Sequence, residues 1–242
     1  MIQVVGGGAA GCEAAWALAR RGVPCRLVTT TLDALYALPA DVWPGTPPSG
    51  TLWASVAREA ADAAGVGTRA AALRRAVKRE LERMPDLLVL QSNVVALWRE
   101  GAEVVGVRTW EGPAHRADAT VLAVGTFLAP RLSVGTAEER AGRLGEMAYD
   151  DLRDDLAAHG VRFVRRRLSV PGDGVTPAHA VAFDQVDPRG TVEGVGDARG
   201  ATGIRRWPGV AGVWLLGACA DPVGVEEAAA AGRDLGAHLA GA

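Results

Sequence analysis

Apolar residues near the start of the chain change from a continuous run to helical spacing and back again. Residues 2–5 (Ile-Gln-Val-Val) read as a short buried strand, residues 12–21 are strong helix formers, and Gly22 supplies a helix stop. Residues 25–29 return to a strand pattern. The N-terminal segment therefore predicts one βαβ unit.

The middle of the chain predicts a loop, two helices, a strand and a β-meander. Prolines and glycines crowd residues 38–51, which predicts an irregular loop. Residues 52–64 and 68–84 have helical spacing, and residues 86–91 return to a strand. Three apolar runs within residues 94–121 are separated by Glu-Gly and Glu-Gly-Pro turns, a pattern typical of a β-meander.

The second half of the chain is harder to interpret. Residues 120–124 predict a buried strand that ends at Gly125. The charged residues 136–160 predict mostly helix, and residues 161–212, rich in Gly, Pro and Arg, predict loops with a few short strands. An apolar strand over 213–216 and an alanine-rich helix over 225–239 close the chain.

Composition limits the function classes. The chain has 242 residues, 49% of them hydrophobic, and a net charge of −2, so no overall charge attracts nucleic acid or an anionic membrane. Three cysteines without a metal-ligand spacing indicate a reducing compartment and no metal site. The absence of a signal peptide pattern and of a long apolar stretch predicts a soluble, cytoplasmic protein without a membrane partner.

A glycine motif carries the main functional prediction. Residues 6–11 (Gly-Gly-Gly-Ala-Ala-Gly) fit G-x-G-x-x-G, follow a predicted strand and open a predicted helix. Gly6 would permit the tight turn, Gly8 the close approach of a pyrophosphate, and Gly11 the packing of helix on sheet. The free amides and the helix dipole would bind the diphosphate. The alternative is a glycine turn in a similar fold without a ligand.

The second strand ends without the acidic residue that often binds an adenosine ribose. Residues 28–31 read Val-Thr-Thr-Thr, so the hydroxyl groups of Thr29 and Thr30 would take this role more weakly. The β-meander followed by residues 120–126 resembles the FAD domain of the glutathione-reductase type. The second glycine turn at 212–219, with its following helix, agrees with that domain, in which the helix N-terminus faces the flavin. The predicted fold is therefore α/β, a Rossmann-type FAD-binding fold with a parallel sheet and a β-meander, and the predicted cofactor is FAD.

Six segments resemble the glucose-inhibited division protein A family and its folate-dependent relatives, FAD enzymes that modify uridines in tRNA. They are residues 6–15, 27–33, 75–87, 124–128 with Gly135, 140–146 and 224–230. The resemblance covers roughly residues 1–36, 75–170 and 205–242. It implies one FAD-binding domain over 1–242, with an FAD core at 1–36, 75–135 and 205–242 and irregular or helical segments at 37–74 and 136–204.

The resemblance also assigns cofactor-binding positions. The pyrophosphate would meet the glycine turn, the adenosine would lie near the second strand and the meander, and the flavin would lie near the second turn. These positions are Gly6, Gly8, Ala9, Ala10 and Gly11, then Thr29, Thr30 and Val94, then Gly125 and Thr126, and finally Gly217, Ala218, Val225 and Glu226.

Two departures from the family's pattern argue against uridine modification by the family's full mechanism in this chain. The stretch 37–41 lacks the family's cysteine, and the segment 171–205 is too short for the family's inserted nicotinamide-handling domain.

The sequence leaves catalysis open. Cys219 could be a nucleophile or redox partner near the flavin, or a small buried residue. His179 could face the flavin, and Glu13 is expected in the first turn of its helix. The basic run at 165–167 could bind tRNA or another phosphate-bearing partner, or form a solvated surface.

Three functions are compatible with these features. The chain could be an FAD oxidoreductase acting on tRNA, an FAD-binding partner subunit of a larger complex, or an FAD oxidoreductase on an unrelated small molecule. The reductant would be NADH, NADPH or a protein partner, and the oligomeric state is open.

Overall fold

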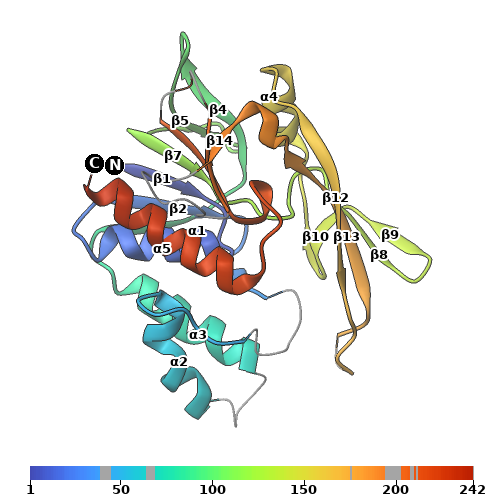
Figure 1. Cartoon of the computed structure of the whole chain (residues 1–242). Helices are drawn as coiled ribbons and strands as arrows, with labels where there is room; N and C mark the ends of the chain where they lie inside the picture. Colours follow the sequence, from blue (N-terminus) through green and yellow to red (C-terminus); the bar gives the residue numbers. More distant parts are fainter. Residues whose placement is uncertain are drawn as a thin grey trace.

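A seven-stranded sheet forms the centre of the protein (Figure 1), whose computed structural model describes residues 1–38, 45–63, 69–174, 176–193, 203–207, 210 and 212–241. The strand order is β14-β15-β16-β7-β1-β2-β3, and β16, β7, β1, β2 and β3 run parallel. The bounds are β1 Ile2–Val5, β2 Cys25–Thr29, β3 Leu87–Gln91, β7 Ala119–Leu122, β14 Val192–Glu193, β15 Ile204–Arg206 and β16 Val213–Leu216. The carboxyl ends of the five parallel strands therefore share one edge.

Alternating side chains divide the core between the two faces of this sheet. Val4 and Leu27 belong to the apolar cluster on the helical face, whereas Val5 and Val28 belong to the cluster on the opposite face. The helical face carries α1 Ala9–Ala19, α2 Leu52–Ala63, α3 Arg69–Glu82 and α5 Val225–Gly241. The opposite face carries the three-stranded meander β4 Val94–Glu100, β5 Glu103–Thr109 and β6 Ala114–Arg116, with α4 Asp151–Ala158 packed on it. The predicted meander is confirmed, and so are the two predicted helices within their described residues.

Two glycines let α5 pack directly on α1. A Cβ added to Gly232 would lie 2.3 Å from the carbonyl oxygen of Ala10, and one added to Gly236 would lie 2.7 Å from that of Ala14. The contacts advance in the same direction along both helices, so the helices run parallel. Both helices therefore begin at the edge where the parallel strands end.

A second sheet, of order β12-β13-β8-β9, stands beside the central one (Figure 1). Its strands are β8 Arg131–Val134, β9 Ala137–Glu139, β12 Phe163–Val170 and β13 His179–Val186, next to a small hairpin of β10 Ala141–Arg143 and β11 Glu146–Met147. The expectation of mostly helix over 136–160 is wrong, because only α4 is helical there. The expectation of loops with a few short strands over 161–212 is right about strands but wrong about their length, since β12 and β13 pair over eight residues each.

The strand β12 was not predicted from the sequence because it contains charged residues. Arg165 and Arg166 stand in the middle of β12, where charged residues weaken a strand pattern. In the structure Asp184 and Gln185 on β13 accept hydrogen bonds from these arginines, at 3.0 and 2.9 Å. Cross-strand pairing therefore stabilises a strand that local propensity does not favour.

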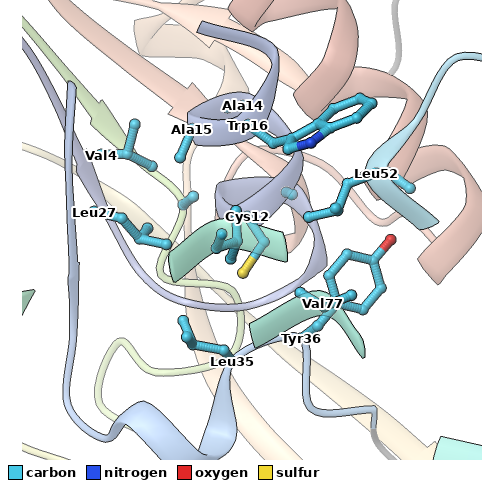
Figure 2. Close-up of a cluster of buried hydrophobic side chains, with 14 of the residues drawn as sticks. Val4, Cys12, Ala14, Ala15, Trp16, Leu27, Leu35, Tyr36, Leu52 and Val77 are labelled. Atoms are coloured by element: carbon cyan, nitrogen blue, oxygen red, sulfur yellow. The ribbon is translucent and has the colours of Figure 1, made fainter. Parts of the chain in front are cut away.

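Glu13 connects α1 to its neighbours inside the helical core. Because α1 begins at Ala9, Glu13 is its fifth residue and not a first-turn residue as expected. Its carboxylate accepts hydrogen bonds from the amides of Leu52 and Trp53, at 2.6 and 3.0 Å, and from the Tyr36 hydroxyl at 2.7 Å. Figure 2 shows Tyr36 and Leu52 close together in the cluster that α1 shares with the sheet. A side chain from α1 therefore caps the start of α2.

No helix in the described part of the chain is long and apolar enough to cross a bilayer. The division into an FAD core and inserted segments stays a prediction. Residues 39–44, part of the predicted loop and of the stretch 37–41, lie outside the described residues.

Candidate functional site

A pocket opens at the edge where β1, β2, β7 and β16 end, and the second sheet forms its opposite wall. The lining on the side of the central sheet includes Gly6, Gly7, Gly8, Ala9, Ala10, Thr29, Thr30, Ser92, Asn93, Val94, Gly125, Thr126, Gly217, Ala218, Gly224 and Val225. The opposite wall includes Arg143, Glu146, Met147, Tyr149, Leu168, Val170, His179 and Val181. Twelve of the fourteen predicted cofactor residues therefore line one pocket, the exceptions being Gly11 and Glu226.

The glycine turn forms a cradle at the start of α1. Gly6 has a φ of 111°, and its amide donates to the Val28 carbonyl at 2.8 Å, which fixes the turn to the sheet. A Cβ on Gly11 would lie 1.9 Å from the Gly6 carbonyl oxygen, so Gly11 serves helix packing and not the pocket surface. A Cβ on Gly8, in contrast, would meet nothing within 4 Å and would project into open space.

The amides of this cradle are available to an anion. Among the described residues, Gly8, Ala9 and Ala10 have no hydrogen-bond acceptor for their amide groups. These amides lie at the positive end of α1 and beside the space left by Gly8. Such an arrangement fits a diphosphate group, which needs converging amides and close backbone approach.

Thr29 and Thr30 end β2 beside the cradle. Thr29 is buried, and its hydroxyl donates to the Thr31 carbonyl at 3.2 Å, whereas Thr30 is exposed to the pocket. Ser92 and Asn93, which sequence reasoning missed, follow β3 directly and line the same region. Their position as polar residues just after a parallel strand was a usable signal for a site at this edge.

The second glycine turn meets the first one. Gly217 has a φ of 75°, and a Cβ there would lie 3.0 Å from the Ala10 side chain. The Ala218 carbonyl accepts a hydrogen bond from the Gln185 side chain at 2.9 Å. Glu226 instead turns away from the pocket, where its carboxylate accepts from the Thr46 amide at 2.6 Å.

Residues 1–172 match the family of glucose inhibited division protein A. The chain belongs to this family. A tRNA uridine 5-carboxymethylaminomethyl modification enzyme, MnmG of Thermus thermophilus, is 37% identical over an alignment of 193 positions, and the match covers 70% of this chain and 32% of that enzyme. The chain thus spans about a third of the length of this curated relative.

Solved structures of the GidA family confirm the fold. A GidA-related protein from Thermus thermophilus superposes with a TM-score of 0.85 at 34% identity, over 98% of this chain and 96% of that one. Aquifex aeolicus GidA superposes with a TM-score of 0.79 at 16% identity, over 99% of this chain and 65% of that one. The predicted Rossmann-type fold and the relation to the GidA and MnmG flavoproteins, which are FAD-dependent, are confirmed.

The cysteines of this GidA relative are buried away from the pocket. The Cys219 thiol donates to the carbonyls of Leu122 and Leu216 at 3.2 and 3.3 Å, and burial raises its pKa. Burial also raises the pKa of Cys12 to about 12. A protonated thiol that donates to backbone favours a core role over a nucleophilic one.

The opposite wall contributes His179, which the sequence suggested could face the flavin, and two polar groups that sequence reasoning did not assign. Arg143 and Glu146 form an ion pair at 2.7 Å. His179 is buried, and its Nδ1 lies 3.0 Å from the Pro177 carbonyl, which fixes the ring. Arg143 lies in one of the segments that resembles the family, but no motif in the sequence indicates that it faces the glycine turn. In the part of the chain that the structure describes, no cluster of His, Cys, Asp and Glu could hold a metal ion.

Proposed function

We propose that this GidA relative is an oxidoreductase that uses FAD bound across the pocket as its redox centre. The observation that carries the proposal is that two helices, α1 and α5, begin at one pocket, where the amides of Gly8 to Ala10 have no acceptor among the described residues. When bound, FAD supplies reversible two-electron chemistry. The protein contributes binding, orientation and electrostatics.

The lining suggests how FAD is held. The amides of Gly8 to Ala10 would bind the diphosphate, Thr29 and Thr30 would contact the adenosine ribose, and Val94 would contact the adenine, since all line the pocket. Gly125, Thr126, Gly217, Ala218 and Val225 lie along the remainder of the cofactor. The positive end of α5 then favours negative charge on the reduced ring. Glu226 supports this helix start indirectly, through its bond to the Thr46 amide.

The substrate approaches along the opposite wall. Met147, Tyr149 and Leu168 are among the exposed large hydrophobic residues, and all three line the pocket. This apolar rim suits a planar organic group, and a tRNA base is the first candidate because the curated relatives are tRNA modification enzymes. Arg165 and Arg167 lie exposed on β12, on the face opposite to the pocket-lining Leu168 and Val170, and offer positive charge to phosphates there. The three free cysteines suit the reducing cytoplasm.

Reconstitution tests cofactor and redox function. Purified protein is incubated with FAD, freed of excess cofactor and examined by absorption spectroscopy, with Gly241→Ala as a control because this helical glycine lies far from the pocket. The bound flavin spectrum is expected, and its bleaching by NADH or NADPH without oxygen would identify the reductant. Protein that stays colourless would refute the proposal.

A partner subunit is the second candidate function, favoured by the absence of cysteine from the described pocket lining. Bound flavin that neither NADH nor NADPH reduces would support it. A gel shift with tRNA, repeated at increasing salt, separates a tRNA substrate from a small molecule. If tRNA binds there, Arg165→Gln and Arg167→Gln should weaken binding and lower its salt dependence.

A further inference from the structure

A largely buried ion pair faces the glycine turn from the opposite wall of the pocket. Arg143 ends β10 and Glu146 begins β11, and their side chains are 19% and 18% exposed. The Arg143 Nη1 donates to the Glu146 carboxylate at 2.7 Å. Both residues line the pocket that also contains the free amides of Gly8 and Ala9.

The loop after β7 holds this arginine in place. The Thr126 hydroxyl donates to the Gly142 carbonyl at 2.8 Å, which attaches β10 to that loop. The Phe127 ring packs so closely on Gly142 that an added Cβ would lie 2.6 Å from it, and the Arg143 guanidinium lies 5.7 Å from the centre of the same ring. The loop after β7 therefore positions the guanidinium at the pocket.

Arg143 and the glycine turn line the same pocket. Burial raises the pKa of the Cys12 thiol to about 12, and the positive charge of Arg143 is the smallest of the effects that act on it. The Cys12 thiol donates to the Gly7 carbonyl at 3.2 Å, directly behind the cradle. The guanidinium thus stands across the pocket from the amides that suit a diphosphate.

We propose that Arg143 binds the diphosphate of FAD, and that Glu146 neutralises the guanidinium until the cofactor displaces it; the proposal rests on FAD binding by this chain. A diphosphate carries more negative charge than one carboxylate, and the planar guanidinium matches phosphate oxygens with two parallel hydrogen bonds. The diphosphate therefore competes successfully with Glu146 for the guanidinium.

Calorimetric titration of FAD, ADP and adenosine into the apoprotein tests this role. R143Q should weaken FAD and ADP binding about 10- to 100-fold, as expected for loss of a charge-assisted hydrogen bond, and should leave adenosine unaffected. E146Q should bind FAD and ADP as tightly as the wild type or more tightly, because it frees the guanidinium. R140Q is the matched control, since Arg140 is 68% exposed, pairs with Asp150 at 3.6 Å and does not line the pocket.

The double variant R143Q/E146Q removes both charges of the pair, so it tests the role even if R143Q does not fold. It should bind FAD and ADP as weakly as R143Q. Equal ADP affinity in this variant and the wild type would overturn the proposal, as would an E146Q variant that loses as much affinity as R143Q. Wild-type protein that rejects FAD but binds ADP through Arg143 would refute the proposed function and support the diphosphate contact.

Discussion

Glu13 provides a direct test of the energetics of the helical core. Its carboxyl group is fully buried, and desolvation raises its pKa to about 7 from 4.5, although the Trp53 amide, the Tyr36 hydroxyl and the Leu52 amide oppose the shift. A carboxyl whose folded pKa lies above its unfolded value binds a proton more tightly in the folded state. Its contribution to stability is therefore complete below about pH 4.5 and is lost as the pH rises through about 7.

The size of the effect follows from the pKa shift. The difference between about 7 and 4.5 corresponds to about 3 kcal/mol, because one pKa unit is about 1.4 kcal/mol. Glu13→Gln removes the titrating group. The free energy of unfolding of the wild type minus that of the variant should therefore fall by about 3 kcal/mol between about pH 4.5 and pH 8.5.

Urea unfolding of both apoproteins, followed by circular dichroism, measures this difference at several pH values. Other titrating groups cancel in the subtraction. Glu82→Gln, at the exposed end of α3, is the control for replacing a carboxyl by an amide in a helix. A difference that stays constant within about 1 kcal/mol, or one that grows with pH, would refute the account of Glu13 as a carboxyl dominated by desolvation.

Three further predictions concern the pocket and its supports. Gly8→Ala should leave thermal stability nearly unchanged but weaken FAD binding at least about tenfold in a fluorescence titration, because the new Cβ points into the cradle. Gly11→Ala should instead lower the free energy of unfolding in urea by about 3 kcal/mol, because its Cβ clashes with the backbone. Asp221→Asn should cost about 3 kcal/mol in the same assay, because the buried carboxylate bonds the Arg205 guanidinium at 2.8 Å. Cys219→Ser should bind FAD and support its reduction at wild-type rates, and a large loss of rate in stopped-flow measurements would restore a redox role for the thiol.

The parts of the fold that sequence reasoning predicted correctly are those governed by local rules. The glycine turn, the helix that follows it and the apolar runs of β1, β2 and β16 each follow from a few neighbouring residues. For the same reason, the predicted residues of the two glycine turns reach one pocket. Gly11 and Glu226 are the exceptions, because Gly11 packs the helix on the backbone of the turn and the Glu226 carboxylate bonds the distant Thr46 amide.

The parts that sequence reasoning missed depend on contacts between distant segments. β12 is stable because β13, separated from it by a loop, supplies partners for its arginines. Glu13 reads as a helix-start residue from its neighbours alone, but its partners Leu52 and Trp53 are about forty residues away in the chain. No periodicity or propensity encodes such pairs, so the opposite wall of the pocket, apart from His179, was not predicted from the sequence.

The two walls of the pocket are expected to have different roles, one in cofactor affinity and the other in substrate choice. Gly232 allows α5 to approach the backbone of α1, and Gly217 contacts Ala10, so both glycine turns belong to one closely packed unit. A small shift in that unit would displace the backbone amides of both turns together. Substitutions in either turn are therefore expected to weaken FAD binding. The second wall carries side chains such as Met147 and Tyr149, whose replacement changes the surface of the pocket and not its backbone. Substrate choice in this GidA relative is therefore expected to reside in the second wall, and cofactor affinity mainly in the first.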